Sequence, residues 1–107
     1  MSIAGEGVYS QTINVSFTFD EDKIDMTLEC IFPNRNDSVA VLWFKGSSRA
    51  VYNCIVEADF PYITVGTCDG PHHVISIKNV QKSLVDDIWR CQYKAENMPK
   101  TVRAPGK

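Results

Sequence analysis

The sequence predicts an all-β domain in which two antiparallel sheets pack into a sandwich. Apolar and polar residues alternate over short segments, turn-forming residues separate these segments, and no long stretch has a sustained helical period. The chain of 107 residues is long enough to bury one hydrophobic core but not two. We therefore expect one domain with about eight strands.

The clearest alternation runs from Ile24 to Cys30, where Ile24, Met26, Leu28 and Cys30 share one face. That face is expected to be buried. By the same criteria we expect strands over residues 13–19, 24–30, 39–45, 51–57, 60–67, 73–80, 88–94 and 101–104.

Three further segments do not have a strand pattern. Residues 33–38 and 97–100 have the composition of a loop and a turn, respectively. Residues 80–89 have rough helical spacing of apolar side chains, which fits a single helical turn between two strands.

Composition and charge exclude several classes of function. The net charge is −2, from 11 basic and 13 acidic residues, and no basic patch indicates binding to nucleic acid or to a membrane surface. The longest apolar run, residues 39–44, is far shorter than the ~20 residues that span a bilayer. No phosphate-binding glycine loop or nucleophile motif is present, so we predict neither an enzyme nor a cofactor.

The four cysteines and two sequons suggest an extracellular protein. An even number of cysteines in a short chain favours disulfides over reduced thiols, and the sequons make Asn14 and Asn36 candidate glycosylation sites. We interpret the chain as a domain of a larger secreted or cell-surface protein. Residues 13–104 would form the domain, residues 1–12 an extension or the start of its first strand, and residues 105–107 a linker.

Two cysteines and a tryptophan form a characteristic constellation. Cys30 ends a predicted strand on its buried face, Trp43 lies within the next apolar strand, and Cys91 follows 61 residues after Cys30. Over nearly the whole chain this pattern resembles the immunoglobulin superfamily. In that family a cysteine on strand B bridges one on strand F across the two sheets, and a strand C tryptophan packs on the bond.

The resemblance implies an immunoglobulin-like two-sheet Greek-key sandwich with a Cys30–Cys91 bridge, of the variable or the intermediate type, leaning towards the variable. It places Cys54 on strand C′ and Cys68 near the end of strand D, so a second bridge between them is the natural pairing. Trp89 stands where the family usually has a tyrosine, which makes the chain a divergent member. We expect Trp89 in the core, without the usual tyrosine-corner hydrogen bond.

Metal binding is the sharpest alternative for the cysteines. Structural zinc sites usually contain closely spaced cysteine pairs, and this sequence has none. His72 and His73 are adjacent in a predicted turn that leads into a strand, and neighbouring strand residues point to opposite faces. We interpret the two histidines as part of a polar loop, and the acidic residues 20–22 as a solvated turn rather than a calcium site.

A partner-binding face follows from the predicted register. If Val41 and Trp43 point inward, Leu42 and Phe44 must point outward on strand C. In the family, strands C, C′, F and G share a sheet, which would place these two beside outward residues of strand F, namely Arg90, Gln92 and Lys94. Two alternatives stay open: Leu42 and Phe44 are covered by side chains such as Tyr52, or the register is off by one.

A second candidate site is the loop end formed by residues 34–38 and 96–100, although a glycan on Asn36 would obstruct it. We expect an extracellular recognition module of an immune or adhesion protein that binds a protein partner, or a second copy of itself, through the C–F face. A spacer domain and a pathogen-encoded mimic of a host surface protein are the alternatives.

Overall fold

The computed structural model describes residues 13–105, which form nine strands and one short 3₁₀ helix. The elements are β1 (Asn14–Asp20), β2 (Lys23–Ile31), β3 (Val41–Lys45), β4 (Ser48–Tyr52), β5 (Ile55–Val56), β6 (Ile63–Thr67), β7 (His72–Val80), η1 (Lys82–Leu84), β8 (Asp87–Tyr93) and β9 (Glu96–Val102).

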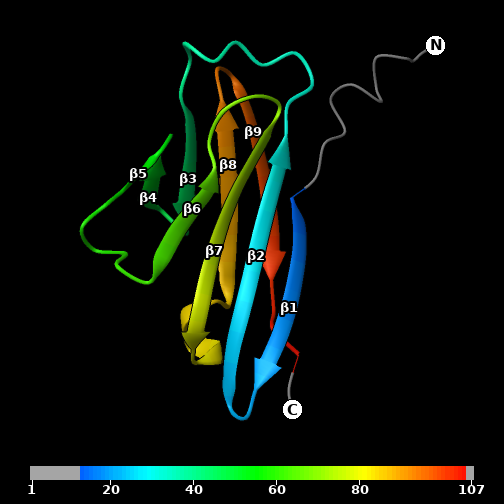
Figure 1. The fold of residues 1–107 in the computed structure, drawn as a ribbon, viewed down its shortest axis with the longest axis vertical. Helices are drawn as coiled ribbons and strands as arrows, with labels where there is room; N and C mark the ends of the chain where they lie inside the picture. The colour runs from blue at the N-terminus through cyan, green and yellow to red at the C-terminus, as the bar shows by residue number, and fades with distance from the viewer. Residues whose placement is uncertain (1–12, 106–107) are drawn as a thin grey trace, which may run out of the picture.

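The strands form two antiparallel sheets that pack face to face (Figure 1). The four-stranded sheet has the order β1-β2-β7-β6, and the five-stranded sheet has the order β5-β4-β3-β8-β9. The chain passes between the sheets after β2, after β5 and after β7, as expected of Greek-key connections. The predicted immunoglobulin-like two-sheet sandwich is thereby confirmed.

The core lies between the sheets and is built from alternating inward residues. Strand β2 follows the predicted pattern, and Ile24, Met26, Leu28 and Cys30 are all buried. Trp43 lies directly opposite Cys91 in the pairing of β3 with β8, and both are fully buried. The Cys30–Cys91 disulfide joins the two sheets at this point, with Cα atoms 6.6 Å apart.

The segment between β7 and β8 contains the helical turn that the sequence indicated, η1. The tyrosine-corner hydrogen bond has a counterpart here, because the indole Nε1 of buried Trp89 donates to the carbonyl oxygen of Val85 at 2.8 Å. Asp86 accepts hydrogen bonds from the Lys82 ammonium and from the backbone N–H of Ala104. These bonds hold the pKa of the Asp86 carboxyl below its usual range and tie η1 to the segment that follows β9.

The final strand is longer than the sequence predicted. Residues 97–100 were expected to form a turn, but they lie inside β9, which pairs with β8 from Glu96 to Val102. The turn prediction was wrong because it relied on Pro99, a residue type that is common in turns. Proline is tolerated here because β9 is an edge strand, where one backbone donor can be absent without breaking a ladder on both sides.

The segment predicted as one strand over residues 51–57 is instead divided. Strand β4 ends at Tyr52, Asn53 and Cys54 form a turn, and β5 contains only Ile55 and Val56. Asn53 has a φ of 54°, a left-handed conformation that reverses the chain. Cys54 therefore lies in the turn after β4 and not on the strand itself.

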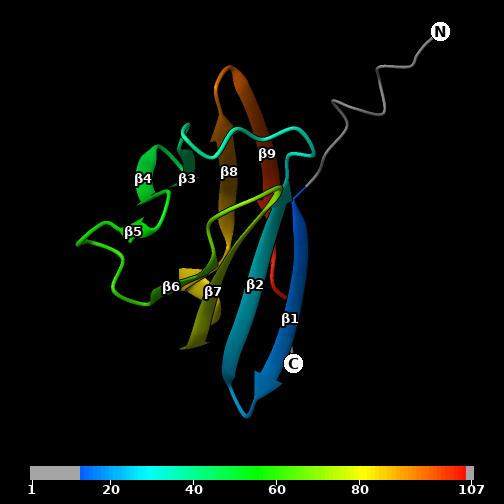
Figure 2. The ribbon, with the colours of Figure 1, turned by 45° about the horizontal axis from the view of Figure 1, so that its top comes forward.

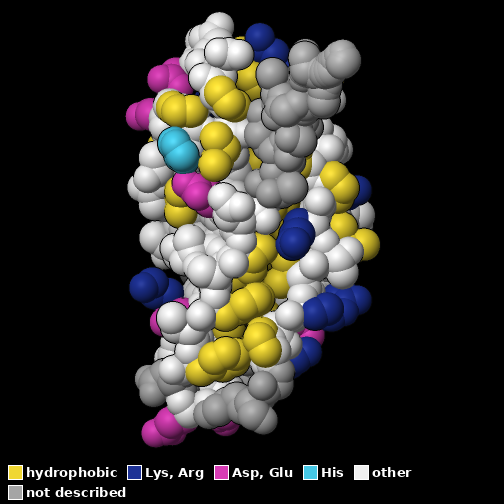
Figure 3. All heavy atoms as spheres, turned by 90° about the vertical axis from the view of Figure 1, so that its right-hand side faces the viewer, with side chains coloured by type: hydrophobic (Ala, Val, Ile, Leu, Met, Phe, Trp, Pro, Cys, Tyr) yellow, Lys and Arg dark blue, Asp and Glu magenta, His cyan; other side chains and the backbone are white. Residues whose placement is uncertain are grey.

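The molecule has two ends and one open side. Figures 1 and 2 show the segment between β2 and β3 and the β8–β9 turn at one end, and η1 and the β1–β2 turn at the other. Among residues 13–105, strands β1 and β9 are the outer strands of their sheets and do not pair with each other. Figure 3 views this open side, where a band of hydrophobic side chains runs along the molecule. Every second residue of β1 from Val15 to Phe19 is apolar; Val15 and Phe17 are half-buried and Phe19 is 41% exposed.

Candidate functional site

The outer face of the five-stranded sheet brings side chains from four strands into one continuous row. Leu42 on β3 lies opposite Tyr52 on β4 and opposite Gln92 on β8. Tyr52 in turn lies opposite Ile55 on β5. Directly opposed residues have closely spaced Cβ atoms, so these four side chains form a strip across the sheet.

A second row lies next to the first. Phe44 is opposite Arg49 on β4 and opposite Arg90 on β8. The Arg90 guanidinium carbon is 5.9 Å from the centroid of the Phe44 ring, and the Arg49 guanidinium carbon is 5.4 Å from that of Tyr52. Each arginine thus borders an aromatic ring at a distance typical of cation–π contact.

The predicted register of β3 is confirmed. Val41 and Trp43 are fully buried while Leu42 and Phe44 are half-buried on the opposite face, so the alternative of a register shifted by one is wrong. Tyr52 lies beside Leu42, as the other alternative required, but it leaves Leu42 partly accessible.

The structure brings Arg90 and Gln92 beside the β3 pair but not Lys94. Strand β8 ends at Tyr93, and Lys94 occupies the β8–β9 turn with a φ of 54°. Its ammonium lies 5.4 Å from the ring centroid of Tyr93. Lys94 is therefore a residue of the loop end and is removed from the candidate face.

Sequence reasoning missed the contribution of β4 and β5. Ile55 exposes 66% of its surface and Tyr52 exposes 46%, the two highest values among large hydrophobic residues in the described part of the chain. Single exposed apolar residues are common, but neighbouring ones on a rigid sheet form the kind of patch that partners bind. The turn at Asn53 places Tyr52 and Ile55 opposite each other on neighbouring strands. The sequence did not indicate this turn, so the two residues were predicted to lie on one strand.

A shallow hollow of about 540 Å³ lies beside this strip and opens to solvent. It is lined by Leu42, Phe44, Ser47, Arg49, Glu57, Ala58 and Asp59. Two of its lining residues, Arg49 and Glu57, form an ion pair, with Nε and Oε2 2.6 Å apart. The predicted outward residues of β3 thus form part of a concavity as well as a face.

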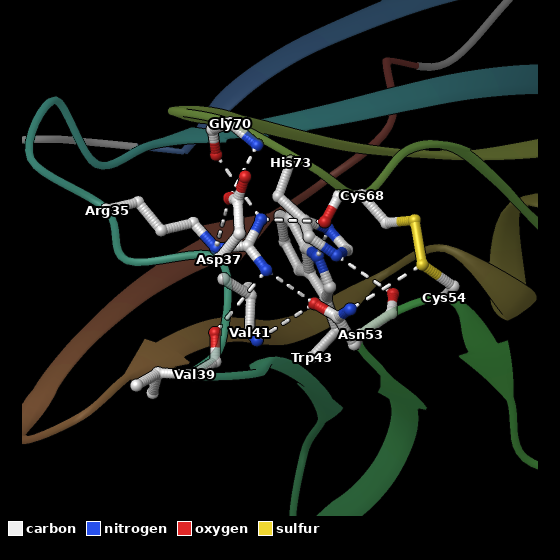
Figure 4. The surroundings of a disulfide bond; sticks show 10 residues. All are labelled: Arg35, Asp37, Val39, Val41, Trp43, Asn53, Cys54, Cys68, Gly70 and His73. Atoms are coloured by element: carbon white, nitrogen blue, oxygen red, sulfur yellow. Dashed lines mark hydrogen bonds and ion pairs between the residues drawn. A yellow bond between two sulfur atoms is a disulfide. The ribbon is translucent and has the colours of Figure 1, made fainter.

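A buried arginine anchors the edge of this sheet (Figure 4). The fully buried side chain of Arg35 donates to the Asn53 Oδ1 at 2.6 Å and to the Cys68 carbonyl oxygen at 2.7 Å. Longer bonds reach the carbonyl oxygens of Gly70 and Val39. Arg35 therefore connects the β4–β5 turn with the end of β6, which belongs to the other sheet.

The Cys54–Cys68 disulfide spans the same gap, with Cα atoms 5.4 Å apart. The pairing that the family resemblance implied is thus present. Together the disulfide and Arg35 fix the turn that separates Tyr52 from Ile55, so the most exposed part of the face has a rigid support (Figure 4). Nothing in the polar sequence around Arg35 indicated that its side chain would be buried.

His73 extends this polar network into the core, contrary to the expectation of a polar loop. It is fully buried and lies between Trp43 and Asn53. Indole nitrogen can only donate, so the Trp43 Nε1 donates to His73 Nδ1 at 2.9 Å, and the proton on Nε2 is donated to the Asn53 carbonyl oxygen at 2.9 Å. A neutral imidazole with one fixed tautomer satisfies both bonds.

The charge state of His73 makes stability depend on pH. Burial lowers the pKa of His73 to about 4, and nearby Arg35 acts in the same direction, against the Asn53 hydrogen bond and Asp69. An unfolded histidine titrates near 6.5, so between pH 6.5 and 4 the unfolded chain binds the extra proton. We predict a loss of about 3 kcal/mol of unfolding free energy over this range.

Urea denaturation at several pH values checks this prediction. His73→Gln should lack this part of the pH dependence, because an amide accepts and donates without titrating in this range. His72→Gln is the matched control, since His72 is exposed and pairs with Glu29 on the outer surface. Equal pH profiles for wild type and His73→Gln would contradict the assignment.

The disulfides argue against the alternative that the cysteines bind zinc. All four cysteines form disulfides, so no thiolate is available as a ligand. His72 and His73 point to opposite faces of β7, as expected for neighbouring strand residues.

Both candidate glycosylation asparagines are exposed. Asn14 lies on β1, and its side-chain amide donates to Glu29 at 3.3 Å. Asn36 lies in the segment between β2 and β3, where its Oδ1 accepts hydrogen bonds from the backbone N–H and the hydroxyl of Ser38. Neither residue belongs to the outer face of the five-stranded sheet.

The loop end differs from the expected one. Residues 96–100 belong to β9, so the β8–β9 connection shrinks to Lys94 and Ala95. The backbone N–H of Asn36 donates to the Tyr93 hydroxyl at 2.6 Å, which ties the opposing segment to β8. The loop end therefore keeps the segment between β2 and β3 but lacks the predicted loop over residues 96–100.

Comparison with models of known protein families and with curated protein sequences found no match. Within residues 13–105, no helix has the length and apolar character required to cross a membrane.

Proposed function

We propose that this domain is an extracellular, non-catalytic recognition module that binds a protein partner through the outer face of its five-stranded sheet. The observation that carries the proposal is the strip across that sheet together with Phe44 of the neighbouring row. The side chains of Ile55, Tyr52, Leu42 and Phe44 are apolar, partly exposed and bordered by two arginines. Aromatic and arginine side chains around an apolar centre are the composition enriched in protein interfaces.

The support beneath this strip favours the same conclusion. The face is a sheet rather than a set of loops, and its outer edge is fixed by a disulfide and by buried Arg35. A rigid face loses little conformational entropy when a partner binds. Two disulfides in a short chain also favour an oxidising, extracellular environment.

A binding screen tests the proposal. The domain would be displayed as a multimer and assayed against an array of cell-surface and secreted ectodomains from the same organism. The array would include this domain itself. We expect at least one specific partner, and we expect Leu42→Lys to weaken that binding about thirtyfold or more, as for a central interface residue. Thr64→Lys, on the exposed surface of β6 in the other sheet, is the matched control and should bind normally.

Two outcomes would contradict the proposal. A module that binds no ectodomain, including itself, would be a spacer. A partner that binds Leu42→Lys as well as it binds wild type would use another surface. Sedimentation velocity of wild type and Leu42→Lys shows whether a second copy of the chain occupies the face.

A further inference from the structure

We infer that the hollow beside β3 and β4 receives a protruding apolar side chain of a protein partner, and that a lysine or arginine of that partner lies next to it. This inference rests on the proposed function and specifies the chemistry of the partner. It follows from the shape of the hollow, from the apolar residues that line it and from its unpaired charge.

The shape favours a protein side chain over a small molecule. The hollow is wide but open, whereas small-molecule sites enclose most of their ligand in a cleft. A side chain projecting from a partner surface needs no enclosure, because the partner itself covers the opening. Leu42, Phe44 and Ala58 provide apolar surface for such a side chain.

The charge in the hollow specifies the neighbour of that side chain. Three charged residues line it, and two of them, Arg49 and Glu57, neutralise each other in an ion pair. The third is Asp59, which is exposed and has no hydrogen bond or ion pair with any described residue. Arg90, the other arginine of the face, does not line the hollow and donates to the Gly46 carbonyl oxygen.

The remaining charge is therefore one carboxylate in a hollow that Leu42, Phe44 and Ala58 line with apolar surface. A partner that placed a carboxylate there would meet repulsion, whereas a lysine or arginine would find an unpaired acceptor. Arg49 is held by Glu57 and lies against the Tyr52 ring, so it is already occupied. The complementary surface is an apolar side chain beside a cation.

A peptide selection tests this inference and does not require the partner to be identified first. A phage library of disulfide-constrained peptides would be selected on the wild-type domain, and the enriched peptides synthesised. We expect them to contain an aromatic or aliphatic residue next to lysine or arginine. Their affinity should fall about tenfold for Asp59→Lys, because charge reversal converts attraction into repulsion. Asp22→Lys, at an exposed turn of the other sheet, should bind within about twofold of wild type.

Comparison of Leu42→Lys with Asp59→Lys separates failure of this inference from failure of the proposed function. Peptides that lose binding to Leu42→Lys but not to Asp59→Lys would overturn the partner chemistry and leave the binding face intact. Peptides indifferent to Leu42→Lys would overturn both. Enrichment of acidic peptides, or no enrichment, would overturn the inference, as would a self-association that Leu42→Lys abolishes and Asp59→Lys leaves unchanged.

Discussion

Replacing both Cys30 and Cys91 with alanine is expected to lower the free energy of unfolding by about 4 kcal/mol, the value that loop-closure entropy gives for a separation of this length. The bridge spans 61 residues and joins the two sheets in the centre of the core. Trp43 packs opposite Cys91, so the smaller side chains also reduce the packing of its indole. For a domain of ordinary stability this loss is a large fraction of the total.

The second disulfide provides the comparison. Cys54 and Cys68 are 14 residues apart, and the same entropy relation predicts about 3 kcal/mol for the Cys54→Ala/Cys68→Ala variant. Urea denaturation followed by tryptophan fluorescence measures both, since Trp43 and Trp89 are fully buried. A peptide map without reduction verifies the remaining bridge in each variant. A smaller loss for the Cys30/Cys91 variant than for the Cys54/Cys68 variant would show that the inter-sheet bridge does not have this role.

Arg35→Met is expected to lower the free energy of unfolding by about 3 kcal/mol, because it leaves buried acceptors without their donor. Two of these acceptors, the Asn53 side chain and the Cys68 carbonyl, are within 2.7 Å of the guanidinium. Arg35→Lys should restore only part of the loss. A single ammonium cannot reproduce the spread of donors that reaches both sides of the gap.

Arg49→Met is the matched control for this prediction. Arg49 also forms an ion pair, but its side chain is 48% exposed, and such surface pairs contribute about 0–1 kcal/mol. The same denaturation assay measures both variants. If Arg35→Met and Arg49→Met were equally stable, Arg35 would not anchor the β4–β5 edge.

The sequence predicted the parts of the fold that depend on alternation and on the inter-sheet constellation. Residues 24–30 have a strict period of two, and the structure buries the expected face. The inward position of Trp43 predicted the register of β3, and this register places Leu42 and Phe44 on the outer face, as the structure shows. The same spacing carried a signal that was overlooked: His73 shares its phase with Ile75 and Ile77, which predicts an inward position.

Other features have no local signal in the sequence. Pro99 has the composition of a turn, and only its place on an edge strand allows it to lie in β9. Arg35 is buried because the β4–β5 turn and the end of β6 converge on it, and both are distant in sequence. The hollow likewise combines β3 with residues 57–59, which no periodicity connects. Tertiary contacts of this kind cannot be derived from a local pattern.

Cross-saturation NMR on the methyl-labelled domain, bound to the partner recovered from the ectodomain array, tests most directly which surface recognises it. If the partner binds the outer face of the five-stranded sheet, saturation of the partner should transfer most strongly to the methyl groups of Leu42 and Ile55, which lie on that face. Strongest transfer to Val15, a half-buried residue of the outer strand β1, would contradict the account and assign recognition to the side between β1 and β9.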